Sequence, residues 1–126
     1  MNNCFILLAA GQSKRFKSSK HKQFISYKNK PLYEHSIIKA IESKLFKKII
    51  LVTNKRKIDV KKFNNKVKII KGGKERSDSS FLGIKYAKKL GAKNVFIHDA
   101  ARPNFSISLL KNISKSLKKI RQLYLL

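Results

Sequence analysis

The sequence lacks the features that define several large protein classes. It contains a single cysteine, Cys4, which excludes an internal disulfide and any cysteine-based metal cluster. It has no run of about 18 apolar residues, so no membrane span is expected. No basic residue precedes the short N-terminal apolar run, which ends at Gly11, and this argues against a secretory signal. We therefore expect a cytoplasmic protein in which Cys4 is a buried, unreactive thiol.

Acidic residues are also scarce. Six Asp and Glu stand against 31 Lys and Arg, which gives a formal net charge of +25 at pH 7. Such an excess serves nucleic acid or small anionic ligands, or it is solvated surface. Most of the basic residues are lysines scattered over predicted helices and loops, and aromatic residues are not interleaved with them as stacking platforms would be. We expect mainly solvated surface and no specific nucleic-acid partner.

The sequence does contain an alternation of apolar runs and amphipathic segments. Short, continuous apolar runs predict four buried strands, at residues 4–9, 48–53, 67–70 and 94–99. Helices are predicted over residues 31–46, opened by Pro31, over residues 79–91, ended by Gly91, and onward from a cap at Ser106 or Ser108. Between the second and third strands lies a basic connector with one weak helical turn.

Apolar residues at helical spacing predict the buried faces of two of these helices. These residues are Leu32, Ile37, Ile38, Ile41 and Leu45 in the first helix and Leu110, Ile113, Leu117 and Ile120 in the last. The element order predicts the α/β class, a Rossmann-like, doubly wound and mostly parallel sheet within one domain over residues 1–126. Ligands of such sheets bind beyond the carboxyl ends of the strands, where three polar stretches fall: residues 10–23, 72–80 and 98–103.

The first polar stretch concentrates positive charge directly after a buried strand. Gly11 permits a tight turn whose N–H groups can face an anion, and Arg15, Lys20 and Lys22 can add charge. No GK[ST] sequence follows at the spacing of a Walker A loop, and the later glycine of a dinucleotide fingerprint is missing. Two interpretations stay open, a phosphate-binding loop and a solvated basic loop.

The second polar stretch begins with two glycines, residues 72–73, which permit close backbone approach. The four residues that follow Arg76 either cap the next helix or read the edge of a base: Ser77, Asp78, Ser79 and Ser80. Arg76 opposes the helix macrodipole at that position. It is therefore expected to pair with Glu75, with Asp78 or with a bound anion.

The third polar stretch begins with Asp99 at the end of a strand. Ala100 and Ala101 leave room for a ligand, and Arg102 follows them. Asp99 is a partner for Mg²⁺ or for a ligand hydroxyl, or else it is a cap or an ion-pair partner of Arg102. We expect His98 to pack at the strand end, because no Ser or Cys nucleophile is placed to form a triad with it.

Together these motifs resemble a known enzyme family. LLAAGQSKRF…KHKQF, GGKERSDSS and HDAARP have the order and spacing found in 2-C-methyl-D-erythritol 4-phosphate cytidylyltransferases, and NKPLYEHSI resembles the stretch before that family's first helix. HDAARP is the most specific of them. The resemblance covers residues 5–110, and its departures are small: Ser13 replaces a frequent Gly, and His21 stands where Pro usually precedes the lysine.

The resemblance implies an activity and a set of site residues. The family transfers CMP from CTP to 2-C-methyl-D-erythritol 4-phosphate, with Mg²⁺ and release of pyrophosphate, in the non-mevalonate route to isoprenoids. Arg15 and Lys22 match its transition-state-stabilising cations. The matching binding positions are Ala9, Ala10, Gly11 and Ser13 around the triphosphate, Gly73 and Ser79 at the cytosine, and Asp99, Ala100 and Arg102 toward the sugar-alcohol phosphate.

Two alternatives accompany this interpretation. Pentitol-phosphate (ribitol-phosphate) cytidylyltransferases share the first loop but differ in the Ala100-Ala101 pair, which favours methylerythritol phosphate as acceptor. Members of the family are close to twice this length. Full-length members form homodimers through an arm in the second half of the chain. That second half also supplies a further lysine to the site. We therefore expect a truncated chain. A non-catalytic basic fragment that binds nucleotide, or nucleic acid without specificity, is the alternative.

Overall fold

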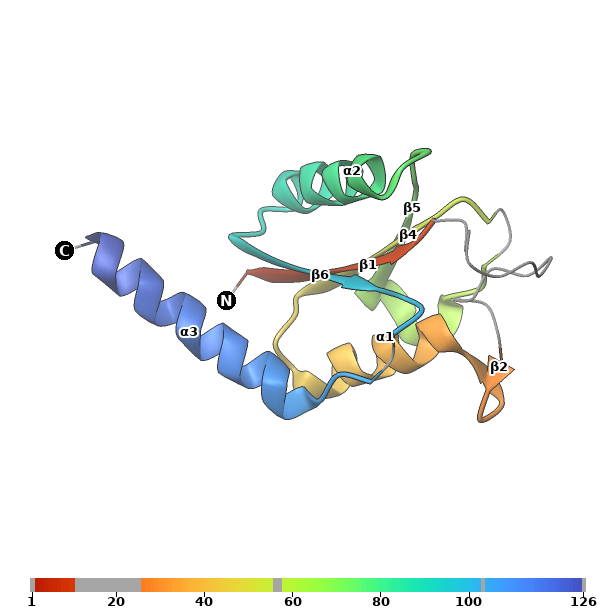
Figure 1. The fold of residues 1–126 in the computed structure, drawn as a ribbon, viewed down its shortest axis with the longest axis horizontal. Coiled ribbons are helices and arrows are strands. Elements are labelled where there is room, and N and C mark those ends of the chain that lie inside the picture. The colour runs from red at the N-terminus through yellow and green to blue at the C-terminus, as the bar shows by residue number, and fades with distance from the viewer. Residues whose placement is uncertain (1, 11–25, 56–57, 103, 126) are drawn as a thin grey trace.

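The computed structural model describes residues 2–10, 26–55, 58–102 and 104–125. A four-stranded parallel sheet carries α2 (Arg76–Lys89) on one face and α1 (Leu32–Ser43) and α3 (Ile107–Leu125) on the other (Figure 1). The sheet consists of β1 (Asn3–Ala9), β4 (Lys48–Thr53), β5 (Val67–Lys71) and β6 (Asn94–Asp99). The predicted α/β class, element order and parallel, doubly wound sheet are confirmed.

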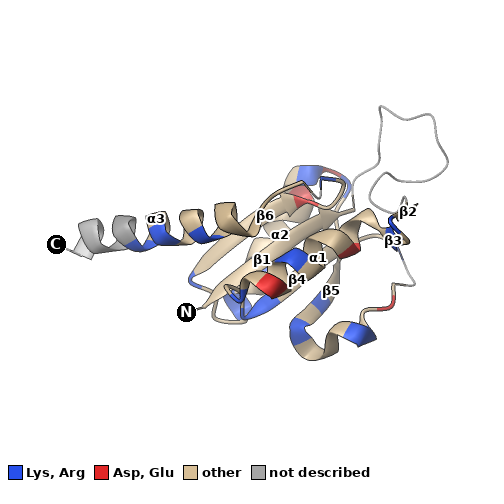
Figure 2. Ribbon diagram, turned by 90° about the horizontal axis from the view of Figure 1, so that it is seen from below, with Lys and Arg blue, Asp and Glu red and all other residues tan. Residues whose placement is uncertain are grey.

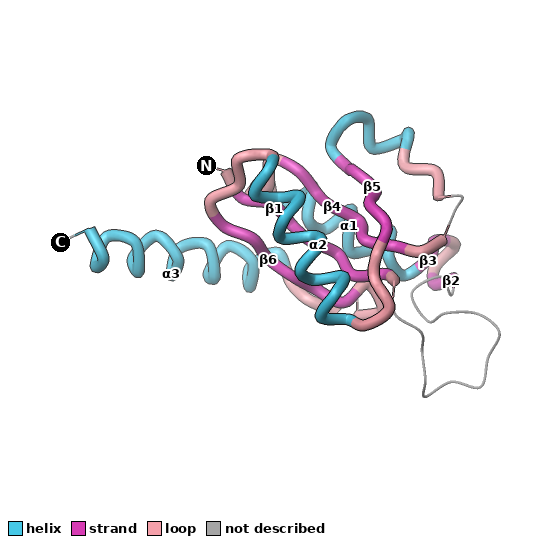
Figure 3. The backbone as a smooth tube through the Cα atoms, turned by 90° about the horizontal axis from the view of Figure 1, so that it is seen from above, coloured by secondary structure: helices cyan, strands magenta, loops and turns pink. Residues whose placement is uncertain are grey.

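The strand order is β5-β4-β1-β6, which places β1 inside the sheet (Figure 3). Leu7 of β1 is aligned with Leu51 of β4 on one side and with His98 of β6 on the other. Every residue of β1 is buried, which explains why this strand is a continuous apolar run rather than an alternating one. Because the strands are parallel, their carboxyl ends, and the loops that follow them, meet at one edge.

The hydrophobic core has two parts, one on each face of the sheet. Phe5 and Leu7 of β1 face α1 and α3, whereas Cys4 and Ile6 face α2. Full burial of each large side chain contributes about 1.5–3 kcal/mol. Cys4 is free and buried, as predicted, and its burial raises the pKa of the thiol, which keeps it protonated and poorly reactive.

The predicted buried faces of α1 and α3 are confirmed in part. Of the apolar residues expected to face the core from α1, Ile37 is fully buried, and Ile41 and Leu45 are partly buried and pack against the core. The small residues Ser36 and Ala40 of the same helix are also fully buried, which the prediction did not include. In α3, Leu110 is buried and Leu117 packs against the core as predicted, whereas Ile113 is 39% exposed and the neighbouring Ser114 is buried instead. The side chain of Ile120 lies outside the described part of the chain.

A short hairpin that the sequence did not indicate precedes α1. It pairs β2 (Ser26–Tyr27) with β3 (Lys30–Pro31), and Pro31 is also the N-terminal flanking residue of α1. Both turn residues, Lys28 and Asn29, have positive φ, as a two-residue hairpin turn of type I′ requires. Further along the chain, the expected weak helical turn in the basic connector is the 3₁₀ segment η2 (Lys61–Lys66).

Charge is spread over the surface rather than gathered on one element. Figure 2 shows lysine and arginine on helices, on β5 and on the connectors around the sheet. This distribution agrees with the expected solvated surface. Among the described residues, no helix combines the length and the apolar character needed to cross a membrane.

One buried carboxylate depends on this basic surface. The Glu34 side chain is 8% exposed, and its Oε1 lies 2.8 Å from Nζ of Lys62. Replacing Lys62 by Met is expected to lower the free energy of unfolding by about 1–3 kcal/mol, since it leaves the buried carboxylate without its cation. Urea-induced unfolding followed by circular dichroism measures the loss. The neighbouring variant Lys61→Met is the control, and an equal loss in both variants would contradict the argument.

Candidate functional site

The carboxyl edge of the sheet gathers parts of the three predicted polar stretches. Ala9 ends β1 and Ala10 follows it, the β5–α2 loop begins at Gly72, and the β6–α3 loop begins after Asp99. The other predicted residues of the first stretch lie outside the described residues, so their roles stay predictions: Gly11, Ser13, Arg15, Lys20 and Lys22.

Gly72 brings the first two stretches into contact. Its N–H donates to the carbonyl of Thr53 at 3.3 Å, which ties the start of the β5–α2 loop to the end of β4. A Cβ at residue 72 would overlap Cβ of Ala10 and would lie 2.7 Å from Oγ of Ser79. Only glycine therefore permits this approach, as the sequence predicted for this pair of glycines.

Ser79 and Asn54 hold the loop in place. Oγ of Ser79 accepts a hydrogen bond from the N–H of Gly73 at 3.1 Å, and Ser79 is buried. The side-chain amide of Asn54 donates to the carbonyls of Ala10 and Gly73, at 3.4 Å each. Asn54 thus joins the first stretch to the second. Asn54 was not predicted. Its place directly after a buried strand, at the edge where ligands bind, could have indicated a role there.

Helix α2 begins three residues earlier than predicted. Its N-cap is Glu75, whose side chain accepts from the N–H of Asp78, while Oδ2 of Asp78 accepts from the N–H of Glu75 at 3.2 Å. This reciprocal pair satisfies two amide donors. Asp78 was among the predicted capping residues, whereas the N-cap Glu75 was not. Among the described carboxylates none forms an ion pair with Arg76.

The β6–α3 loop is a compact turn built around Asp99. Oδ1 of Asp99 accepts from the N–H of Ala101 at 3.0 Å, and the N–H of Ala100 donates to the carbonyl of Leu8 at 2.9 Å. Nε of Arg102 lies 4.0 Å from Oδ2 of Asp99, and the two side chains are 76% and 42% exposed. An exposed pair at this distance contributes at most about 1 kcal/mol. Both side chains therefore remain open to a ligand.

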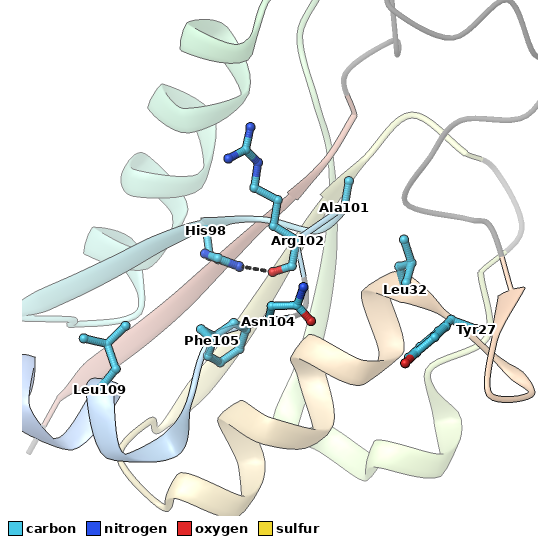
Figure 4. Close-up of a pocket in the computed structure, with 8 residues that line it drawn as sticks. All are labelled: Tyr27, Leu32, His98, Ala101, Arg102, Asn104, Phe105 and Leu109. Carbon is cyan, nitrogen blue, oxygen red and sulfur yellow. Dashed lines mark hydrogen bonds between the residues drawn. The ribbon is translucent and has the colours of Figure 1, made fainter.

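His98 contacts this turn through a hydrogen bond to its main chain. Its ring packs edge-on against Phe105, with centroids 4.7 Å apart, and its Nε2 is hydrogen-bonded to the main-chain carbonyl of Arg102. The expected packing of His98 at the strand end is confirmed. In Figure 4 the guanidinium of Arg102 points away from this contact. His98 therefore holds the backbone of the turn without contacting the guanidinium group of Arg102.

A cavity of about 740 Å³ adjoins the turn on the side of α1 and α3. Its lining comes from the β2–β3 hairpin, the start of α1, the turn itself and the start of α3 (Figure 4): Tyr27, Leu32, His98, Ala101, Arg102, Asn104, Phe105 and Leu109. This volume suits a small-molecule ligand. The polar groups of the turn thus stand at the rim of a space that can hold one.

Comparison with known proteins assigns the family. A model of the family IspD, 2-C-methyl-D-erythritol 4-phosphate cytidylyltransferase, matches residues 3–124 of the chain. The chain belongs to this family. The predicted resemblance is confirmed. Two of the segments that carry it, GGKERSDSS and the described residues 98–102 of HDAARP, lie at the edge described above.

Individual cytidylyltransferase relatives match along most of the chain. A bifunctional enzyme IspD/IspF of Pelagibacter ubique is 52% identical over 120 residues, which cover 94% of this chain and 32% of that protein. A 2-C-methyl-D-erythritol 4-phosphate cytidylyltransferase of Clostridium botulinum is 43% identical over 117 residues, covering 87% of this chain and 51% of the relative. The chain spans about half the length of the curated cytidylyltransferases that it matches.

Solved structures of the cytidylyltransferase family share the fold. The bifunctional IspDF of Campylobacter jejuni superposes with a TM-score of 0.73 at 30% sequence identity, covering 94% of this chain and 31% of that one. The parallel sheet and its flanking helices are therefore the nucleotidyltransferase fold of these relatives.

Proposed function

We propose that this chain transfers CMP from CTP to 2-C-methyl-D-erythritol 4-phosphate and releases pyrophosphate. The family match over residues 3–124 carries the proposal, and the Clostridium relative is named for this activity. The edge geometry supports it, because an exposed arginine and an exposed carboxylate stand beside a cavity of small-molecule size.

The reaction needs charge stabilisation more than acid–base chemistry. A phosphate oxygen of the acceptor, anionic at neutral pH, forms a bond to the α-phosphorus of CTP, and the bond from that phosphorus to the bridging oxygen breaks as pyrophosphate leaves. No general base is needed for such a nucleophile. The protein must bring two polyanions together and stabilise the charge that builds up. We assign that stabilisation to Arg15 and Lys22.

The nucleotide is proposed to lie across the first two loops. Ala9, Ala10, Gly11 and Ser13 would surround the triphosphate, and the second loop would hold the cytosine at Gly73 and Ser79. Support comes from the contact of Ala10 with Gly72 and from the bridging amide of Asn54. The two subsites would be adjacent, because these contacts join the end of β1 to the β5–α2 loop.

A magnesium ion is part of the proposal. The described residues contain no group of three or more His, Cys, Asp or Glu side chains able to hold a metal ion. That composition fits Mg²⁺, which keeps several waters and combines one or two carboxylates with substrate phosphates. Asp99 is suited to be that carboxylate, since it is partly exposed at the strand end. The ion would neutralise triphosphate charge when the nucleotide binds.

The acceptor is proposed to lie at the β6–α3 turn. Arg102 would pair with its phosphate and Asp99 with a hydroxyl or with the metal. Ala100 is fully buried, whereas Ala101 lines the cavity, so Ala101 is the member of the pair whose size sets the space for an acceptor. Methylerythritol phosphate is favoured over a pentitol phosphate because pentitol-phosphate enzymes tend to carry a different residue in this Ala-Ala pair.

Turnover by the 126-residue chain tests the proposal. With CTP, methylerythritol phosphate and Mg²⁺, we expect pyrophosphate release that depends on all three and is faster than with ribitol 5-phosphate. Thermal stabilisation by CTP–Mg²⁺, compared with ATP–Mg²⁺ and inorganic triphosphate, tests the nucleotide site separately. CTP-specific stabilisation without turnover would contradict catalysis by this chain and retain the site. Equal stabilisation by every polyanion would contradict both.

Ser79→Ala is expected to weaken CTP binding about 5- to 20-fold, because the N–H of Gly73 loses its acceptor and the loop loosens. The factor corresponds to about 1–2 kcal/mol for one lost hydrogen bond. Isothermal titration calorimetry with CTP–Mg²⁺ measures it. Ser77→Ala, which removes an exposed hydroxyl from the same turn of α2, should leave the Kd within about twofold. Equal Kd values for the two variants would remove Ser79 from the site.

A further inference from the structure

A second concave surface lies on the other face of the sheet, between β5 and α2. It has a volume of about 570 Å³ and is lined by Ile70 and Lys71 of β5 and by one side of α2: Leu82, Lys85, Tyr86, Lys88 and Lys89. We term these seven residues the α2–β5 groove. None of them belongs to the proposed nucleotide or acceptor site, so the groove is a separate feature of the surface.

The floor of the groove is apolar and open to solvent. Ile70 and Tyr86 pack partly against the core, and Leu82 is 37% exposed. The groove also borders a sheet edge, because β5 is the last strand in the order and no strand of the described chain pairs with its outer side. Figure 3 shows β5 on the side of α2 away from β6. Apolar surface beside an unpaired strand edge is typical of peptide recognition.

The rim of the groove is entirely basic. Lys71, Lys85, Lys88 and Lys89 surround the floor, and none of the described acidic side chains lines it. The ion pairs among the described residues involve none of these four lysines. Their charge is therefore not neutralised within the described chain. An occupant that contacted both the floor and the rim would combine apolar side chains with negative charge.

We propose that the α2–β5 groove binds an acidic segment of a partner protein in which apolar side chains alternate with carboxylates. A second copy of this chain would bring another +25 charge against the lysines. Nucleic acid would neutralise the lysines but has no apolar side chains to contact the floor of the groove. A flat anionic bilayer would contact the rim but would not reach the floor. The free edge of β5 favours an extended segment, whose alternate side chains would lie over Ile70 and Leu82.

A synthetic peptide of ten alternating Leu and Glu residues, labelled with fluorescein, serves as the probe. Fluorescence anisotropy with the 126-residue chain should show saturable binding that weakens as NaCl increases. We expect Leu82→Glu and the double variant Lys85→Glu/Lys89→Glu each to weaken it at least about 10-fold, as anchor and rim substitutions do. Because lysines cover the whole chain, the control Lys111→Glu/Lys115→Glu removes two exposed lysines from α3 and should change binding less than about threefold.

Four results decide between the alternatives. A peptide of alternating Ser and Glu should bind at least about 10-fold more weakly, which would show that the apolar floor contributes. No binding of the Leu/Glu peptide, or equal losses in the two double variants, would overturn the proposal. The proposal would also be overturned if the peptide does not bind and the groove instead binds vesicles containing phosphatidylserine or single-stranded DNA. Circular dichroism and thermal unfolding establish that each variant is folded.

Discussion

Replacing Arg15 or Lys22 by alanine is expected to lower kcat for pyrophosphate release by about 10²–10³-fold while CTP affinity changes far less. A fixed cation at the α-phosphorus stabilises charge that develops only in the transition state. Its loss is comparable to the loss of an oxyanion-hole donor, on the order of 2.7–4 kcal/mol. The measurement is kcat at saturating CTP and methylerythritol phosphate, together with the Kd of CTP–Mg²⁺ from calorimetry.

The same loop provides the matched control. Lys14→Ala and Lys17→Ala remove one positive charge each from the same stretch, and we expect both lysines to be solvated. Their kcat should stay within about threefold of the parent value, as for exposed charges in general. A near-normal kcat for Arg15→Ala or Lys22→Ala, or an equal decrease in all four variants, would contradict the assigned roles.

Phe5→Ala is expected to lower the free energy of unfolding by about 3–5 kcal/mol, the range for removing a buried aromatic side chain. Phe5 is 1% exposed, and its ring centroid lies 5.0 Å from that of Phe46 and 5.8 Å from that of Phe105. The cavity would therefore open between the sheet, the end of α1 and the segment that leads into α3. Against a total stability of about 5–15 kcal/mol, such a loss unfolds a large share of the molecules near 37 °C.

The control for Phe5→Ala is the same substitution at an exposed site. Phe81 on α2 is 65% exposed, so Phe81→Ala should change the free energy of unfolding by less than about 0.5 kcal/mol. Chemical denaturation in urea, followed by far-UV circular dichroism, compares the two variants. Similar losses in both variants would show that the ring of Phe5 is not packed as described.

The strands were predictable from their continuous apolar runs. Burial on both faces holds for the central strands β1 and β4, whereas the edge strands β5 and β6 are only partly buried, contrary to the prediction of four buried strands. Residues 48–53 and 94–99 were predicted with the bounds that β4 and β6 have, and β1 and β5 differ from the prediction by one residue each. A short, continuous apolar run bounded by glycine or polar residues is typical of such a strand. The β2–β3 hairpin was missed because two-residue strands with mostly exposed side chains produce no periodic pattern.

The site was predictable only in part. The parallel sheet alone implied that residues 10, 73 and 99 meet at one edge, and the family motifs supplied their proposed roles. Asn54 was missed because its importance depends on two carbonyls, at Ala10 and Gly73, that lie 44 and 19 positions away in sequence. Likewise, the start of α2 depends on hydrogen bonds from backbone amides to the carboxylates of Glu75 and Asp78. The serines around them made a hydroxyl cap equally plausible from the sequence. The roles of Arg15 and Lys22 stay predictions.

The position of β1 in the sheet also affects how the protein is made. Within this chain β1 is synthesised before the other strands and pairs on one side with β6, so Asn3 meets its partner Asn94 only after 91 further positions have been synthesised. At ~5–20 residues per second, this interval is on the order of 10 s. During it, one edge of the most apolar strand in the chain has no native partner. Pairing of β1 with β6 is thus the most non-local step in forming the described sheet, and this edge of β1 stays open to wrong pairing until β6 has been synthesised.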